Sequence, residues 1–359
     1  MSCFERLNLS IPIIQGGMGI GVSLSSLAGS VAAQGAMGVI STANPGYDRP
    51  DFWKNPAACN MEALRHHIKR AKELAKGQGV VAINAMVATT RYTETVAAAI
   101  QAGVDAIISG AGLPLHLPSV EGAEHVALAP IVSGAKAIST ICKLWDKRFN
   151  RVPDFVVVEG SQAGGHLGFS KEEVLEGKAK PLHMLVEEVC QALVPWQEKY
   201  HQAIPVFAAG GVLDGADIAK MEQHGAYGVQ MATSFIATEE CDASEGYKKA
   251  ILAAKDEDVR IVQSPVGMPG RGLASPLLDK LAAAGRIAPS RCANCLVPCN
   301  PLNTPYCITH ALIEAVKGNW EEGLFFCGGN VGKINQMTTV PALIRRLTEE
   351  WKQAKQHCI

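Results

Sequence analysis

Residues 159–166, Glu-Gly-Ser-Gln-Ala-Gly-Gly-His, combine a glycine-rich turn with a titratable side chain. They follow the apolar run 155–158, Phe-Val-Val-Val, which has the composition of a strand buried on both faces. Gly164 and Gly165 carry no Cβ, so a flat ligand can press against the backbone there. His166 is the side chain of this turn whose charge changes near neutral pH. The segment predicts a strand end that presents a cofactor together with a proton-transferring group. The competing interpretation is an ordinary glycine-rich loop with a solvated histidine.

A second group of residues with possible chemistry is a set of four cysteines, Cys292, Cys295, Cys299 and Cys307. Their spacing is C-x2-C-x3-C-x7-C, and three prolines in the same stretch favour a loop over a helix. Four thiolates in such a loop can surround a tetrahedral zinc ion or a [4Fe–4S] cluster. The spacing therefore predicts a metal centre, with iron–sulfur preferred to zinc. Free buried thiols and a redox disulfide are the alternatives.

Composition limits the class of protein. The chain has 359 residues, of which 48% are hydrophobic and 19% charged, so it can form a large core. Its 33 basic and 34 acidic residues give a formal net charge of −1, which argues against a nucleic-acid or anionic-membrane partner. The first residues do not resemble a secretory signal, and no apolar run has the length of a membrane span. Eleven cysteines in such a chain lead us to expect a cytoplasmic protein with reduced thiols or metal ligands.

Short apolar runs alternate with amphipathic segments through the first two-thirds of the chain. The predicted strands are 12–15, 38–42, 80–86, 106–109, 126–132, 155–159, 205–209 and 228–232. The predicted helices are 24–34, 61–76, 93–101, 135–148, 182–200 and 216–224. Residues 111–124 are rich in Gly and Pro, so we expect the fourth helix to be short or absent.

Eight strands with crossovers predict a (β/α)8, or TIM, barrel. An open doubly wound sheet is the alternative, but the glycines at 16, 17, 19 and 21 do not fit its Gly-x-Gly-x-x-Gly spacing. The predicted domains are a (β/α)8 barrel at 1–238, a Cys-containing extension at 239–338 and a C-terminal helix packed on the barrel at 339–359. Thr338 or Thr339 is expected to cap that last helix, with Pro341 in its first turn.

Barrel active sites lie at the carboxyl ends of the strands. Here those ends carry small, neutral hydrogen-bonding residues, which suit a flat heteroaromatic cofactor better than a charged metal site. After the seventh and eighth strands come Gly210-Gly211 and Thr233-Ser234, where barrels commonly bind a phosphate. The alternative is a pair of tight turns that need glycine for their backbone conformation.

Four segments together resemble the nitronate monooxygenases (formerly 2-nitropropane dioxygenases) and the related flavin-dependent enoyl-acyl-carrier-protein reductases. They are 12–19, PIIQGGMG; 163–166, AGGH; 208–211, AAGG; and 230–238, QMATSFIAT. The resemblance covers about residues 10–270. It implies FMN in a barrel, with a histidine above the isoalloxazine ring.

The resemblance also assigns roles by position. His166 would be catalytic, and the phosphate would be held by Gly210, Gly211, Ala232 and Thr233. The remaining cofactor-binding residues would be Gln15, Gly17, Met18, Asn84, Gln162 and Gly165. Two departures weaken the transfer of substrate class: the family usually has Glu where this chain has Gln162, and Gly-Thr-Arg-Phe where this chain has Ala-Thr-Ser-Phe at 232–235. The cysteine loop is similar to that of the iron–sulfur flavoenzymes related to 2,4-dienoyl-CoA reductase.

Three functions follow from these observations. The preferred one is FMN-dependent oxidation of alkyl nitronates or nitroalkanes by O2. The second is NAD(P)H-dependent reduction of an activated C=C bond in enoyl thioesters. The third is a barrel that binds a phosphate ligand without redox chemistry. In each case the partner is a small molecule, and the sequence leaves open whether the chain forms a homo-oligomer.

Overall fold

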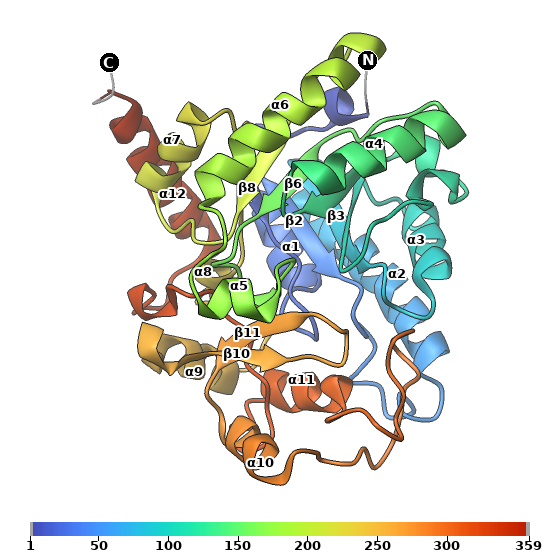
Figure 1. The fold of residues 1–359 in the computed structure, drawn as a ribbon, viewed down its shortest axis with the longest axis vertical. Coiled ribbons are helices and arrows are strands. Elements are labelled where there is room, and N and C mark those ends of the chain that lie inside the picture. Colours follow the sequence, from blue (N-terminus) through green and yellow to red (C-terminus); the bar gives the residue numbers. More distant parts are fainter. Residues whose placement is uncertain (1–2, 357–359) are drawn as a thin grey trace.

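Eight parallel strands close into a barrel in the order β1-β2-β3-β4-β5-β6-β8-β9 in the computed structural model, which describes residues 3–356 (Figure 1). The strands are β1 (Ile13–Gln15), β2 (Met37–Ser41), β3 (Val80–Met86), β4 (Ala106–Gly110), β5 (Ala127–Val132), β6 (Val156–Glu159), β8 (Val206–Ala209) and β9 (Gly228–Met231). Each predicted barrel strand is present, and its ends differ by at most one residue from the prediction. The predicted (β/α)8 fold is confirmed.

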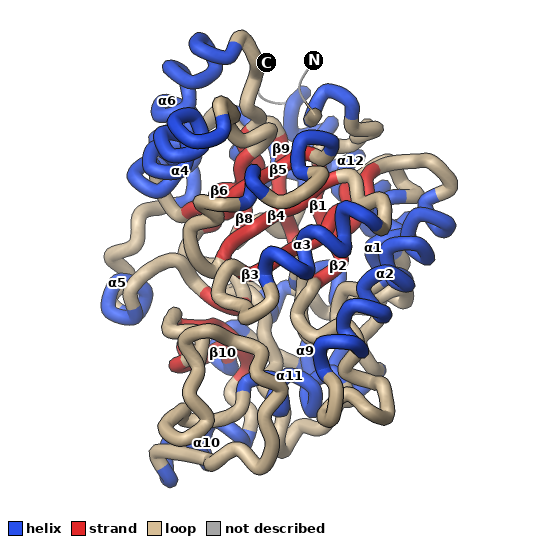
Figure 2. Tube along the Cα trace, turned by 90° about the vertical axis from the view of Figure 1, so that its right-hand side faces the viewer, coloured by secondary structure: helices blue, strands red, loops and turns tan. Residues whose placement is uncertain are grey.

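Helices cover the outside of the barrel (Figure 2). They are α1 (Ser25–Ala32), α2 (Pro56–Ala75), α3 (Tyr92–Gln101), α4 (Ala135–Phe149), α6 (Leu182–Tyr200) and α7 (Gly215–Gln223), with the short α5 (Lys171–Leu175) and α8 (Thr233–Ile236) in loops. Helix α2 begins five residues before the predicted start, because Pro56 occupies its first turn, where its fixed φ is favourable. None of the helices among residues 3–356 is long and apolar enough to cross a membrane.

Both faces of the strands are buried, as the continuous apolar runs predicted. Along β6, Val157 faces an inner cluster with Phe155 and Phe207, and Val156 and Val158 pack outward among the helices. Phe4 closes the amino-terminal end of the barrel, with its ring 5.4 Å from that of Phe155. The barrel interior is therefore closed at the amino-terminal ends of the strands, and a ligand site can form at their carboxyl ends.

The fourth crossover departs from the repeating pattern, as its glycines and prolines predicted. The 3-10 turns η2 (Leu117–Ser119) and η3 (Ala123–His125) occupy this crossover in the described chain. Trp145 of α4 packs against this crossover in place of a helix. It is fully buried, and its Nε1 donates a hydrogen bond to the carbonyl of Pro114 at 3.0 Å.

The last helix, α12 (Val340–Gln356), packs on α7 and α1, where the eighth helix of the barrel would lie. Thr339 Oγ1 accepts a hydrogen bond from the Ala342 amide at 3.3 Å, so Thr339 is the capping threonine of the two considered. Trp351 Nε1 and Lys355 Nζ both reach the Glu222 carboxylate of α7, at 3.0 and 2.8 Å. These contacts fix the C-terminal helix on the barrel wall.

The segment between the barrel and α12 contains helices and strands that were not predicted from the sequence. The helices α9 (Glu245–Ala253), α10 (Pro276–Ala284) and α11 (Ile308–Val316) pack beside the hairpin β10 (Val259–Gln263) and β11 (Pro269–Leu273). β11 also pairs with β7 (Gly165–His166), a short strand from the barrel loop. The extension is thus joined by a sheet to the turn that carries His166, below the barrel in Figure 1.

Candidate functional site

A cavity of about 650 Å³ opens at the carboxyl ends of the barrel strands. Every barrel strand contributes to it, through Gly16, Ser41, Asn84, Gly110, Ile131, Glu159, Ala209 and Gln230 or their neighbours. The volume lies within the range of cofactor and small-molecule sites. The cavity therefore occupies the position where barrels carry out their chemistry.

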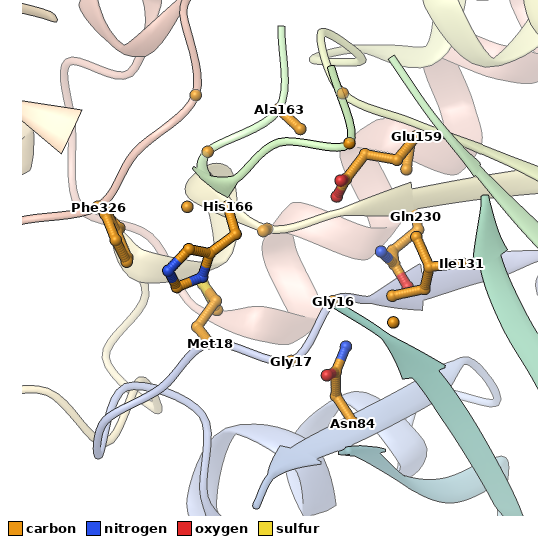
Figure 3. A pocket seen from close by; sticks show the side chains of 18 of the residues that line it. Gly16, Gly17, Met18, Asn84, Ile131, Glu159, Ala163, His166, Gln230 and Phe326 are labelled. Carbon is orange, nitrogen blue, oxygen red and sulfur yellow. The ribbon is translucent and has the colours of Figure 1, made fainter. Parts of the chain in front are cut away.

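The barrel side of this cavity presents polar groups to a ligand. The strand register aligns Glu159, Ala209 and Gln230 at one level, so their side chains share the inner face. Figure 3 shows Asn84, Glu159 and Gln230 around one open space, with His166 on the opposite side. Within the described residues, Gln230 Oε1 is buried and has no hydrogen-bond partner. A buried acceptor of this kind is normally satisfied, so it suits a ligand that donates a hydrogen bond here.

The loops after β8 and β9 form the proposed phosphate end. Gly210 and Gly211 have φ values of +89° and +95°, which explains why glycine is required in this turn. Thr233 and Ala232 face the same cavity. Thr233 Oγ1 accepts a hydrogen bond from the Gly328 amide at 2.9 Å, and its hydroxyl proton remains to be donated. This end of the cavity is therefore lined by glycine backbone and by the hydroxyl group of Thr233, a lining that is typical of phosphate sites.

His166 is held in the cavity wall by the extension. Its backbone lies in β7 opposite Gly270, and its Nε2 is 2.7 Å from Ser264 Oγ. The ring contacts Phe326 edge-on, with centroids 5.3 Å apart. Burial in this wall lowers the pKa of His166 to about 4, so the imidazole is neutral at neutral pH.

The extension also shapes the loop before His166. Arg271 of β11 donates to the carbonyl oxygens of Ser161 and Ala163, the latter at 3.0 Å. Gly164 packs directly on the backbone of Cys327, where a Cβ would lie 2.5 Å from the carbonyl carbon. Asn330 Nδ2 donates to the Gly211 carbonyl at 3.1 Å. The sequence Cys-Gly-Gly-Asn at 327–330 is typical of a tight turn and supplies part of this contribution, whereas nothing in the sequence identified Arg271 or Ser264.

Most of the residues predicted to bind the cofactor line this cavity. They are Gly17, Met18, Asn84, Gln162, Gly165, Gly210, Gly211, Ala232 and Thr233, together with His166. Gln15 is the exception and requires a correction. Its side chain is fully buried in the wall, where Oε1 accepts from the Val39 amide at 3.0 Å. Gln15 thus stabilises the pairing of β1 and β2 and does not face the cavity.

Glu159 was not among the predicted site residues, although it ends β6 and faces the cavity. Desolvation raises the pKa of its carboxyl group to about 8, so the carboxyl is largely protonated at neutral pH. A neutral carboxylic acid can donate a hydrogen bond as well as accept one. The feature of the sequence that could have identified Glu159 is a carboxylate at a predicted strand end, shortly before the glycine-rich turn 163–166.

The raised pKa of Glu159 predicts how the stability of the ligand-free protein depends on pH. The unfolded chain loses this proton near pH 4.5 and the folded chain near pH 8, so the folded state binds more protons between these values. The free energy of unfolding should therefore fall as the pH rises through this window. His166 acts in the opposite sense, but only below pH 6.5. We expect urea unfolding of the ligand-free protein from pH 6.5 to 8 to show this fall, and Glu159→Gln to flatten it. An equal slope in the variant would contradict the assignment.

The four cysteines of the C-x2-C-x3-C-x7-C loop lie together, away from the barrel cavity. Cys292, Cys295, Cys299 and Cys307 line one small cavity of about 20 Å³. Burial raises the pKa of Cys295 to about 11, and the three neighbouring thiols add to this shift. Although the four thiols line one cavity, no set of three or more His, Cys, Asp or Glu side chains in the part of the chain that the structure describes is arranged to hold a metal ion. The zinc or [4Fe–4S] centre stays a prediction, to be tested by iron, zinc and acid-labile sulfide analysis, and the function proposed below does not depend on it.

Three comparisons place the chain among known proteins. The family model described as nitronate monooxygenase matches residues 3–350. A probable nitronate monooxygenase of Staphylococcus saprophyticus is 28% identical over 298 residues, which is 77% of this chain and 79% of that protein.

Two solved structures are similar in fold. FabK from Thermotoga maritima has a TM-score of 0.76 at 24% identity, covering 99% of this chain and 96% of that one. The nitroalkane oxidase from Streptomyces ansochromogenes has a TM-score of 0.71 at 20% identity, covering 98% and 99%. Since the family model spans nearly the whole chain, this protein belongs to the nitronate monooxygenase family.

Proposed function

We propose that this protein is an FMN-dependent oxidoreductase that oxidises alkyl nitronates with O2. The observation that carries the proposal is the glycine-lined cavity at the barrel strand ends, with a neutral imidazole in its wall. Membership of the nitronate monooxygenase family supports the same reaction class.

The residues present fit FMN. Gly210, Gly211, Ala232 and Thr233 would hold the phosphate, and the unpartnered Gln230 Oε1 would accept a hydrogen bond from the bound cofactor. Met18, Asn84, Gln162 and Gly165 line the space that the ring system would occupy. When bound, FMN supplies the redox chemistry by taking electrons from the substrate and passing them to O2.

The role of His166 follows from its charge state. A neutral imidazole can donate a hydrogen bond to a nitronate oxygen, and its hydrogen bond to Ser264 fixes the ring orientation. With a pKa near 4 it is a weak base, so it would remove a proton from a neutral nitroalkane slowly. We therefore expect the ionised nitronate to be a better substrate than the nitroalkane.

Reduction of an enoyl thioester by NAD(P)H is the second candidate. A further cavity of about 290 Å³ on the other side of His166 favours it, because an elongated substrate needs room beyond the cofactor. In that reaction His166 would have to be protonated before it could complete reduction of the C=C bond, which its pKa of about 4 disfavours at neutral pH.

An anaerobic experiment separates the two candidates. FMN-loaded protein is mixed in one series with an alkyl nitronate and in another with NADH or NADPH, and the flavin absorbance is followed. We expect rapid bleaching by the nitronate and reoxidation when O2 is admitted. Bleaching by NAD(P)H but not by the nitronate would overturn the oxidase in favour of the reductase.

A further inference from the structure

A second cavity adjoins the cofactor cavity at His166. It has a volume of about 290 Å³ and shares Ala43, Met86, His166 and Leu312 with the first. Its outer walls come from the start of α2, the cysteine loop at 293–296 and the start of α11. A ligand in this cavity would therefore reach the imidazole from the side away from the barrel strands.

Apolar side chains make up about half of the lining of this second cavity. Ile20, Leu64, Val266, Leu296 and Ile308 all line it, and all are less than 9% exposed. Water in contact with such a surface is released favourably when an apolar ligand replaces it.

Several of the polar side chains in these walls are already hydrogen-bonded within the protein. Asn60 Nδ2 donates to Asn44 Oδ1 at 2.9 Å, and Asn44 Nδ2 donates to Thr309 Oγ1 at 3.3 Å. Arg91 lines the outer rim and is paired with Glu94 at 2.6 Å. Since these polar groups are already bonded within the protein, an incoming ligand gains most from contacts with the apolar side chains of the wall.

We propose that the second cavity binds the unbranched hydrocarbon chain of the substrate, with the reacting end of the substrate beside His166. This inference rests on the proposed function and narrows it to nitronates of long-chain nitroalkanes. Each methylene that enters the cavity should raise kcat/KM by about fourfold until the cavity is filled.

Two neighbouring alanines at the start of α2 provide the test. Ala57 lines the second cavity, whereas Ala58 is exposed and does not. Replacing Ala57 by Phe would fill part of the cavity, and Ala58→Phe adds the same ring to the same helix turn outside it. The readout is the ratio of kcat/KM for octyl nitronate to that for ethyl nitronate.

We expect a ratio far above 10 in the wild type and in Ala58→Phe, and a ratio at least tenfold lower in Ala57→Phe. A ratio near one in the wild type would overturn the inference, as would equal ratios in the two variants. Both variants should bind FMN as the wild type does, which shows that they are folded.

A binding measurement keeps this inference separate from the proposed reaction. The thermal midpoint of the FMN-loaded protein is measured with n-alkanols of increasing length, which bind without being oxidised. Stabilisation that grows with chain length in the wild type and not in Ala57→Phe supports the cavity even if no nitronate is turned over. Turnover of ethyl nitronate without any dependence on chain length would support the reaction and contradict the cavity assignment.

Discussion

Replacing His166 by Asn should lower kcat for nitronate oxidation by a factor of about 10²–10⁴, the usual effect of losing a positioned proton-transfer or hydrogen-bonding group. The imidazole lies between the two cavities, and its Nε2 is fixed by Ser264 at 2.7 Å. Asparagine is shorter than histidine, so its amide cannot occupy the positions of both ring nitrogens, one of which contacts Ser264 while the other donates to the nitronate. FMN content should not change, because His166 lies at the wall opposite the barrel strands (Figure 3).

A matched control is His201→Asn at the end of α6. His201 is exposed and has a φ of +49°, a conformation that asparagine tolerates well. It should retain wild-type turnover and flavin content. Unchanged turnover in His166→Asn would remove this residue from the reaction, and loss of flavin there would assign it to cofactor binding.

Placing a carboxylate at the proposed phosphate end should abolish tight FMN binding. Ala232 faces the cavity between the loops after β8 and β9, and Ala232→Asp would set a negative charge against the phosphate. Two like charges about 4 Å apart at a partly exposed site repel by up to roughly 4 kcal/mol, so we expect the Kd for FMN to rise by about 10²–10³.

Ala232→Ser is the matched control, since it adds one polar atom without charge. Apoprotein is titrated with FMN, and the quenching of flavin fluorescence gives Kd for the wild type and both variants. A serine variant that binds normally beside an aspartate variant that does not would support the phosphate assignment. Equal affinities in all three proteins would place the phosphate elsewhere.

The barrel could be predicted from the sequence because its signals are local. Each strand is a short apolar run, each crossover begins with a turn, and the closure of eight such units follows from their number. Gly165, Gly210 and Gly211 could also be recognised, since their positive φ requires glycine whatever surrounds them. These features depend on neighbours in the sequence.

The rest of the site depends on residues distant in sequence. Ser264 and Arg271 reach the His166 loop from a hairpin about 100 residues further along, and the sequence between them carries no periodic signal for this contact. Gln15 was assigned to the cofactor by its position in the segment 12–19, which carries the family resemblance. Its strand is buried on both faces, so the sequence could not show that Ile14 faces into the barrel and Gln15 away from the cavity.

The central claim is that the cavity at the barrel strand ends binds a flavin. The visible absorption spectrum of the protein, recorded after incubation with FMN and removal of free FMN by gel filtration, tests it most directly. We predict the bands of oxidised flavin at about one FMN per chain, and their loss when an alkyl nitronate is added without O2. A protein that remains colourless after this treatment would contradict the claim and favour a barrel that binds a phosphate ligand without redox chemistry.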